Sequence, residues 1–316
     1  MTRPRVLLAG AIDPSGERLI ATRADIVAAP DVRPETLRRL VPEADVLVVR
    51  AQLPPDLFDH APRLRGVVRH GVGLDMIPME AACAHGLPVA NVPGSNRDAV
   101  AEHVLMCFGL LTRHTQRMDR SLRESGWDAS RGLAERATEL NGRTVGIVGV
   151  GSIGLRIAEI CHFGYRMPVL GHQRRLDALP AFIEGAALDE LLARSDFVVL
   201  GCPLNAATRG LIDARRLALM KLGAFLVNVA RGAVIEEGAL IAALREGRLA
   251  GAALDVFESQ PLLALDNVLL TPHVAGLTAQ SMARMSQGTA EEVLRLLAGE
   301  RPVNLVNPEV WERRPR

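Results

Sequence analysis

The sequence predicts an α/β protein with two doubly wound parallel-sheet domains and a ligand cleft between them. Three observations lead to this fold class. Short apolar runs alternate with helical stretches along most of the chain, a long helical stretch divides those runs into two series, and the last helix has no strand after it. A length of 316 residues also corresponds to about two domains.

The first series of strands occupies the first third of the chain. Each run is apolar on both faces, as expected of a parallel strand that helices cover on both sides. The expected strands are Val6–Leu8, Asp25–Ala28, Val46–Val49, Gly66–Val68 and Val89–Val92. Helices are expected at Arg33–Leu40 and Met76–His85, and a long helix should run from Asp98 to about Glu124, before Gly126 and a loop to Asn141.

The second series begins after that loop and again alternates strands with helices. Its expected strands are Thr144–Val148, Pro168–Gly171, Phe197–Leu200, Ala224–Val229, Ala252–Phe257 and Val268–Leu270. The last helix, Thr278–Leu297, has no strand after it and should return to the first domain. We therefore expect one domain from residues 1–97 plus 281–316 and a second domain from residues 98–280.

Composition excludes several classes of partner. The net charge is +1, from 37 basic and 36 acidic residues, which leaves no electrostatic footprint for nucleic acid or an anionic membrane. None of the four cysteines forms a CxxC pair or pairs with histidine at metal-ligand spacing, so no metal site is expected. The N-terminus has no signal-peptide core, and the longest apolar helical stretch, Val104–Leu111, is too short to span a bilayer. We expect a cytoplasmic protein.

A glycine-rich turn is the strongest local motif. Gly149, Gly151 and Gly154 follow the strand Thr144–Val148 and precede a helix. In this context the first glycine permits a tight turn, the second lets a pyrophosphate approach the backbone, and the third lets the helix pack close to the strand. The phosphates would then lie at the helix N-terminus, where free N–H groups favour negative charge. The motif predicts dinucleotide binding.

The end of the next strand bears on the choice of cofactor. An acid is expected there in an NAD enzyme, to bind the adenosine ribose. The sequence instead has Gln173, Arg174 and Arg175. Guanidinium groups bind phosphate bidentately, so these arginines suit a 2′-phosphate and favour NADP over NAD. The alternative is that both arginines belong to a solvated strand end.

Polar residues stand at three strand ends of the second series. Arg231 follows the strand Ala224–Val229, Asp255 and Gln260 flank the end of the next one, and His273 follows the last. Ligands bind at the carboxyl ends of parallel strands. Reduction of a keto acid needs a fixed cation for the carboxylate and an acid that protonates the carbonyl oxygen. Arg231 and His273 supply these two groups.

At these residues the chain resembles the D-2-hydroxyacid dehydrogenase family. Besides the glycine turn, the matching segments are Gly71–Asp75, Asn91–Gly94, Val100–His103, Cys202–Leu204, Asn228–Gly232, Gly251–Phe257 and Thr271–His273. The resemblance extends from about Val46 to Pro308. It implies a flavodoxin-like substrate domain made of both chain ends, a central Rossmann-like nucleotide domain, and a homodimer formed through the nucleotide domain and the long helix.

The resemblance also implies residue roles. Arg231 would bind the substrate carboxylate and carbonyl, His273 would donate the proton in reduction, and Asp255 would hold the nicotinamide carboxamide. The expected cofactor-binding set is Gly149, Gly151, Ser152, Ile153, Gly154, Gln173, Arg174, Arg175, Cys202, Pro203, Val229, Ala230, Asp255 and Gly276. The expected substrate-binding set is Arg50, which ends a strand of the first series, with the backbone of Val72 and Gly73, and Asn96.

Two departures from the family pattern stand out. Gln260 occupies the place where relatives usually carry a glutamate that pairs with the catalytic histidine; a glutamine can orient the ring of His273 but brings no charge. Gln260 would therefore complete the catalytic set. In addition, the segment from Gln260 to His273 is shorter than in most relatives.

These residues support reduction of a short 2-keto acid, such as glyoxylate or hydroxypyruvate, to the D-2-hydroxy acid. Two alternatives remain open. A glutamine at position 260 also resembles the formate dehydrogenases of the same superfamily. A binding protein that senses the nucleotide without turnover would use the same fold, because fold does not dictate function.

Overall fold

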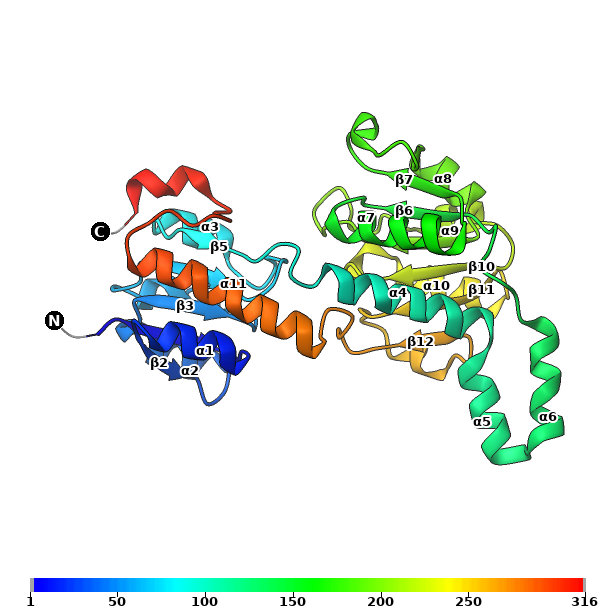
Figure 1. Ribbon diagram of the computed structural model, residues 1–316, viewed down its shortest axis with the longest axis horizontal. Helices are drawn as coiled ribbons and strands as arrows, with labels where there is room; N and C mark the ends of the chain where they lie inside the picture. Colours follow the sequence, from blue (N-terminus) through cyan, green and yellow to red (C-terminus); the bar gives the residue numbers. More distant parts are fainter. Residues whose placement is uncertain (1–2, 315–316) are drawn as a thin grey trace. The chain divides into compact units, whose positions relative to one another are not determined.

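The computed structural model describes residues 3–314 and consists of two compact units (Figure 1). Unit 1 is formed by Met1–Asn96 together with Leu277–Arg316, and unit 2 by Arg97–Gly276. Both units are α/β, which confirms the predicted fold class.

Unit 1 contains a sheet of five strands, all parallel, in the order β2-β1-β3-β4-β5. The strands are β1 (Arg5–Ala9), β2 (Asp25–Ala28), β3 (Val46–Val49), β4 (Gly66–Arg69) and β5 (Val89–Ala90). The helical segments are α1 (Pro14–Ala21), α2 (Pro34–Leu40), η1 (Val41–Glu43), η2 (Leu57–His60), α3 (Met79–Ala84), α11 (Ala279–Leu297) and η8 (Pro308–Arg313). This strand order is the flavodoxin-like order.

Alternating side chains place helices on both faces of this sheet. Val6 and Leu8 of β1 belong to one buried cluster with side chains of α1 and α11. Leu7 and Ala9 of the same strand belong to the cluster on the other face, with side chains of α2 and α3. A strand that buries both faces must be apolar throughout, which explains the continuous hydrophobic runs of the sequence.

Unit 2 contains a sheet of seven parallel strands, in the order β12-β11-β10-β9-β6-β7-β8. The strands are β6 (Val145–Val148), β7 (Val169–His172), β8 (Glu184–Gly185), β9 (Phe197–Leu200), β10 (Ala224–Asn228), β11 (Leu249–Leu254) and β12 (Val268–Leu270). The helical segments are α4 (Arg97–Thr112), α5 (Thr115–Ser125), α6 (Trp127–Arg131), η3 (Gly132–Arg136), α7 (Ser152–Glu159), η4 (Ile160–Gly164), η5 (Leu176–Ala178), α8 (Leu188–Arg194), α9 (Ala214–Leu219), η6 (Gly232–Val234), α10 (Glu237–Arg245) and η7 (Gln260–Ala264). Side chains of α4 and α7 cover one face of the sheet, and those of α8, α9 and α10 cover the other.

The expectation of one helix from Asp98 to Glu124 is wrong. α4 ends at Thr112 and α5 begins at Thr115, because His114 has a φ of 50° in the left-handed region. A left-handed residue cannot continue a right-handed helix, so the chain turns there. The segment expected as a loop after Gly126 also contains α6 and η3. In Figure 1, α5 and α6 run side by side as a helical hairpin.

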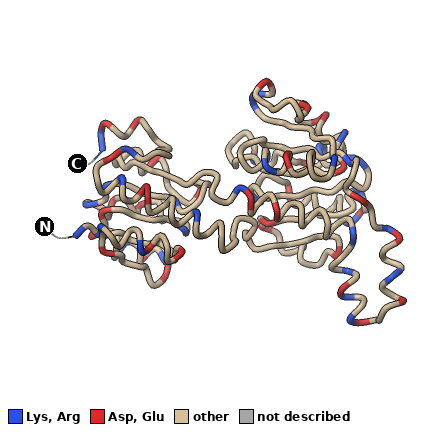
Figure 2. Tube along the Cα trace, in the orientation of Figure 1, with Lys and Arg blue, Asp and Glu red and all other residues tan. Residues whose placement is uncertain are grey.

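The described residues include no helix that is long and apolar enough to cross a membrane. Acidic and basic residues are interspersed along both units (Figure 2). All four cysteines are free thiols.

Candidate functional site

The glycine-rich turn joins β6 to α7, and packing requires two of its glycines. Gly149 has a φ of +96°, and a Cβ atom on it would lie 2.7 Å from the backbone nitrogen of Cys202. A Cβ atom on Gly154 would lie 2.3 Å from the carbonyl oxygen of Gly149. Side chains at either position would therefore force the turn, the helix or the neighbouring loop to move.

Gly151 is different, because nothing lies within 4 Å of the place where its Cβ atom would be. It precedes α7 and offers no side chain to cap the first N–H groups of that helix. Open space beside uncapped N–H groups at a helix N-terminus suits an anionic group such as a pyrophosphate. This arrangement fits a dinucleotide.

The same turn lies at the topological switch point of unit 2. β6 has β7 on one side and β9 on the other, so the connections leave the sheet in opposite directions. Gly201, directly after β9, donates its N–H to the carbonyl oxygen of Val148 at 2.9 Å. Ligands bind at such a point in open α/β sheets. The adjacent thiol of Cys202 is buried, and burial raises its pKa, so it packs as an apolar group.

The end of β7 is tied to the glycine turn, since the N–H of Gly149 donates to the carbonyl oxygen of His172 at 2.8 Å. The side chain of Gln173 donates to the carbonyl oxygen of Arg175 at 2.7 Å. Arg175 lies 3.7 Å from Asp177 in an exposed ion pair, whereas Arg174 is exposed and has no carboxylate partner in the described part of the chain. Two arginines with exposed side chains thus follow the strand end that is tied to the glycine turn.

The carboxylate of Asp255, after β11, is 3% exposed and accepts hydrogen bonds from the loop after β12. Its Oδ1 atom accepts hydrogen bonds from Thr271 Oγ1 at 2.6 Å and from the N–H of Val274 at 2.9 Å. Its Oδ2 atom accepts one from the N–H of Ala275 at 3.0 Å. Asp255 therefore organises this loop, and Oδ2 keeps a lone pair for a further donor.

His273 lies within that loop in an unusual backbone conformation. Its φ is 57°, and it is one of three non-glycine residues with positive φ among the described residues. Its N–H donates to the carbonyl oxygens of Asp255 at 2.8 Å and Thr271 at 3.0 Å, while the side chain is exposed. Such backbone strain collects at functional sites, where the surrounding structure maintains it.

The loop after β10 holds Arg231 through a buried amide. Asn228 is 0% exposed; its side chain donates to the carbonyl oxygen of Arg231 at 2.9 Å and accepts from the N–H of Ala230 at 3.0 Å. The guanidinium of Arg231 is partly buried and donates to the carbonyl oxygen of Ala230 at 2.6 Å. The N–H of Asp255 donates to the carbonyl oxygen of Asn228 at 3.0 Å, which links this loop to the loop of His273.

Gln260 opens η7, and its side chain is exposed. Within residues 3–314, no hydrogen bond joins it to His273. The loop before it is held instead by Glu237, whose carboxylate accepts from the N–H groups of Glu258 and Ser259.

Four residues that organise this edge were not assigned a role from the sequence: His103, Asn228, Glu237 and Thr271. His103, on α4, lies with its Nε2 atom 3.4 Å from Thr271 Oγ1, and burial lowers its pKa. For His103, Asn228 and Thr271 the available signal was their position within the family-like segments, whereas Glu237 lies outside those segments. His103, Glu237 and Thr271 have partners that are distant in sequence.

The remaining cofactor candidates lie along the same edge of unit 2. Ser152 and Ile153 begin α7, Pro203 follows β9, Val229 and Ala230 follow β10, and Gly276 ends the loop after β12.

In unit 1, Arg50 lies at the corresponding switch point, between β1 and β3. A Cβ atom on Gly10, after β1, would lie 2.9 Å from the Cβ atom of Arg50. The guanidinium of Arg50 donates to the carbonyl oxygen of Ala11 and approaches the sulfur of Met282 at 4.0 Å. Burial lowers its pKa, and no carboxylate pairs with it in the described part of the chain. A partly buried cation without an acid suits an anionic ligand.

Neighbouring loops of unit 1 carry the other substrate candidates. Arg69 donates to the carbonyl oxygen of Gly73 at 2.9 Å, and Asn91 donates to that of Val72 at 2.9 Å, so both carbonyls have protein partners. The Oδ1 atom of Asn96 is buried and accepts no hydrogen bond from any of residues 3–314. An unsatisfied buried oxygen is costly, which makes Asn96 a place where a donor group would be favourable.

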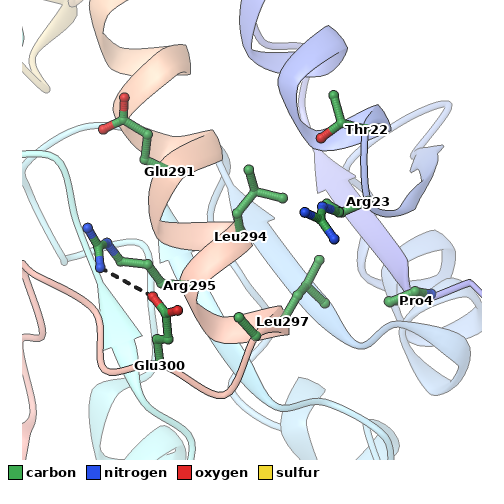
Figure 3. Close-up of a pocket in the computed structure, with 9 residues that line it drawn as sticks. Pro4, Thr22, Arg23, Glu291, Leu294, Arg295, Leu297 and Glu300 are labelled. Atoms are coloured by element: carbon green, nitrogen blue, oxygen red, sulfur yellow. Dashed lines mark hydrogen bonds and ion pairs between the residues drawn. The ribbon is translucent and has the colours of Figure 1, made fainter.

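A hollow in unit 1 lies at another place. It has a volume of about 730 Å³ and lies between the C-terminal ends of α1 and α11, beside Pro4 at the amino end of β1 (Figure 3). In Figure 3, Arg295 forms an ion pair with Glu300. The side chain of Leu294 lies on the side of α11 that is turned toward Arg23. This hollow is lined by none of the residues described above and lies at the amino end of β1, away from Arg50 and the other candidate residues of unit 1.

Comparison with known proteins gives consistent results. Residues 105–275 match the model of the D-isomer specific 2-hydroxyacid dehydrogenase, NAD binding domain. The chain is 36% identical to a glyoxylate reductase of Pyrococcus furiosus, over 98% of this chain and 96% of that protein. It is 38% identical to a D-3-phosphoglycerate dehydrogenase of Mycobacterium bovis, but the aligned part covers 97% of this chain and 59% of that longer protein.

A solved structure is similar over the whole length. It is an NADPH-dependent glyoxylate/hydroxypyruvate reductase from Sinorhizobium meliloti in complex with NADP and malonate. The TM-score is 0.86 and the identity 28%, and the match covers 100% of this chain and 99% of that one.

Proposed function

We propose glyoxylate or hydroxypyruvate as the substrate of this chain, which belongs to the D-isomer specific 2-hydroxyacid dehydrogenase family. As a member of that family, it is an NAD(P)-dependent oxidoreductase that reduces a 2-keto acid. The observation that carries the proposal is the loop after β12, where Asp255 holds His273 at a φ of 57°. The names of the similar glyoxylate and hydroxypyruvate reductases support a short substrate.

In this proposal Arg231 binds the substrate and His273 transfers the proton. The guanidinium of Arg231 binds the carboxylate of the keto acid and polarises its carbonyl group. The bound reduced nicotinamide supplies the hydride. The exposed imidazole of His273 gives a proton to the carbonyl oxygen, and in the reverse direction it takes that proton back. Gln260 contributes a neutral partner for the imidazole, which requires η7 to bring its amide to the ring.

We also propose that NADPH is preferred over NADH. Arg174 and Arg175 stand beside the turn that would hold the pyrophosphate, and Arg174 has no carboxylate partner among the described residues. A 2′-phosphate would give that guanidinium an anionic partner. The similar NADPH-dependent reductase supports the same choice.

The test is the initial rate of NADPH and NADH oxidation with glyoxylate, hydroxypyruvate, pyruvate and longer 2-keto acids. We expect turnover with glyoxylate or hydroxypyruvate, faster with NADPH. Turnover confined to longer keto acids would overturn the substrate assignment. Reduction of the oxidised cofactor by formate, without turnover of any keto acid, would favour the formate alternative, and cofactor binding without any turnover would favour a sensor.

A homodimer formed through unit 2 is part of the proposal. α5 buries none of its residues, and the α5–α6 hairpin exposes Leu122 (45%) and Trp127 (69%). A dimer that uses this hairpin would cover both apolar side chains. We expect sedimentation equilibrium to give twice the chain mass, and Trp127→Ser to weaken the association; a monomeric wild-type chain would refute this part.

The cytoplasm is the proposed location. The thiols of Cys107 and Cys161 are buried, and burial raises the pKa of each to about 12, so neither is poised to form a disulfide. Cell fractionation tests this location.

A further inference from the structure

The carboxylate of Glu237 makes a bidentate contact with backbone N–H groups of the loop after β11. Its Oε1 atom accepts a hydrogen bond from the N–H of Glu258, and its Oε2 atom accepts one from the N–H of Ser259, both at 2.7 Å. Hydrogen bonds to a carboxylate are shorter and stronger than neutral ones. Since Glu237 is the first residue of α10, the contact ties that helix to the loop after β11.

The clamped loop connects two residues of the candidate site. It begins at Asp255, which organises the loop of His273, and ends at Gln260, where η7 starts. The backbone between them forms neither helix nor strand. A loop of this kind samples many positions unless side chains hold it. The two bonds to Glu237 reduce that freedom directly before Gln260.

The clamp also lies against the loop of Arg231. A Cβ atom on Gly232 would lie 3.3 Å from the Cα atom of Phe257, 3.3 Å from Glu258 and 3.4 Å from Glu237 Oε1. The residue after Arg231, the clamped loop and the carboxylate of Glu237 are therefore in close packing. A shift of the clamped loop would therefore also displace the loop that carries Arg231.

We propose that Glu237 is a positioning residue for the reaction, which fixes the loop leading to Gln260 against the loop that carries Arg231. This inference rests on the proposed function, since it gives Gln260 and Arg231 their roles. Glu237 acts through these residues, because its carboxylate oxygens are engaged by the backbone of Glu258 and Ser259.

The test uses Glu237→Gln, with Glu236→Gln as the matched control. The amide of the new side chain accepts one backbone N–H and opposes the other. The side chain of Glu236 is exposed and forms no hydrogen bond in the described part of the chain. We expect Glu237→Gln to lower kcat about tenfold, with the Kd of NADPH within about twofold of wild type. Glu237→Asp, which is one methylene shorter, should fall between the two.

A double-mutant cycle with Gln260→Ala separates positioning from general loss of structure. If Glu237 acts by placing Gln260, the double variant should lose no more kcat than the worse single variant. If the losses in kcat of the two single variants multiply in the double variant, to about a hundredfold, the two residues act independently and the inference is overturned. A Glu237→Gln enzyme with the kcat of Glu236→Gln would overturn it as well.

Hydrogen exchange separates this inference from the proposed function. In the apo protein, the peptide spanning Glu258 and Ser259 should exchange about tenfold faster in Glu237→Gln than in the control. Unchanged exchange overturns the inference even if the wild type is active. If the wild type turns over no keto acid, the proposed function fails, and the positioning role fails with it, while faster exchange would still establish the clamp.

Discussion

Thr271 Oγ1 donates a 2.6 Å hydrogen bond to Asp255 Oδ1, and this bond joins the last two strands of unit 2 at their carboxyl ends. The N–H of His273 donates to the carbonyl oxygen of the same aspartate at 2.8 Å. Because His273 has a φ of 57°, its conformation depends on such contacts. The imidazole that we propose as the proton donor is thus positioned by groups that need not touch the substrate.

Replacing Thr271 by valine should weaken this arrangement. The change removes a donor from a carboxylate that is 3% exposed, so Oδ1 keeps one hydrogen bond, from Val274. We expect the free energy of unfolding of unit 2 to fall by about 1.5–3 kcal/mol, the usual contribution of a hydrogen bond to a charged group. We expect kcat to fall about tenfold, since the loop of His273 loosens. Denaturant unfolding and steady-state rates measure the two effects.

Thr271→Ser is the control, since it retains the hydroxyl group and loses only a methyl group. It should restore most of kcat. A valine variant with wild-type rates and stability would show that the hydrogen bond does not hold the loop.

The glycine turn allows a prediction that separates folding from cofactor binding. Gly151→Ala has open space for its methyl group and an ordinary φ of −78°, so the apo protein should melt within about 2 °C of wild type. The methyl group would lie where a pyrophosphate approaches, so we expect the Kd of NADPH to rise at least about tenfold. Calorimetric titration and thermal melting measure the two quantities; unchanged affinity would place the phosphates elsewhere.

Gly154→Ala should give the opposite pattern. Its Cβ atom would lie 2.3 Å from the carbonyl oxygen of Gly149, and backbone cannot yield as a flexible side chain can. We expect a loss of about 1–3 kcal/mol in the free energy of unfolding, as in other overpacked sites. A variant as stable as Gly151→Ala would contradict the close packing of α7 on β6.

The fold was largely predictable because buried parallel strands leave an unambiguous pattern. The strands Asp25–Ala28, Val46–Val49, Phe197–Leu200 and Val268–Leu270 have the expected bounds. β8 was missed because it comprises two exposed residues. The break at His114 was missed because a single left-handed residue leaves no mark in the hydrophobic period, and α5 buries no residue that could reveal a change of direction.

The sequence indicates the residue types of the candidate site but not the hydrogen bonds that connect them. Arg231 and His273 were selected as a cation and an acid at strand ends. Their supports, Asn228 and Thr271, hold them through hydrogen bonds to the backbone and to Asp255. A sequence pattern does not show which polar side chain faces a neighbouring loop. The roles of Arg231, His273, Gln260 and Asp255 toward substrate and cofactor stay predictions.

Arg174 provides the prediction for cofactor choice. If its guanidinium binds a 2′-phosphate, Arg174→Ala should lower the ratio of kcat/KM for NADPH over NADH by about tenfold, which corresponds to one charge-assisted contact. Rates with NADH should change little, because that cofactor has no 2′-phosphate. The exposed Arg209 offers a control, since Arg209→Ala removes an equal charge from the loop after β9. An unchanged ratio would overturn the NADP preference attributed to this residue.

His70 should make the stability of unit 1 depend on pH. Its imidazole is 3% exposed and lies 2.8 Å from Ser286 Oγ. Burial, together with the charges of Arg50 and Arg69, lowers the pKa of His70 from 6.5 to about 4. The unfolded chain therefore binds a proton at a higher pH than the folded chain does. Stability is complete above about pH 6.5 and is lost as the pH falls toward about 4.

Between about pH 7 and pH 5 this linkage removes about 2 kcal/mol from the free energy of unfolding. His70→Gln retains an amide near Ser286 but carries no titrating group. Between about pH 7 and pH 5, its free energy of unfolding should therefore fall by about 2 kcal/mol less than that of the wild type. Trp311 lies in unit 1 and Trp127 in unit 2, so urea unfolding followed by fluorescence in a Trp127→Phe background reports on unit 1. Equal pH dependence in the two proteins would mean that the proton is taken up at another group, and that His70 is already accessible to protons in the folded state.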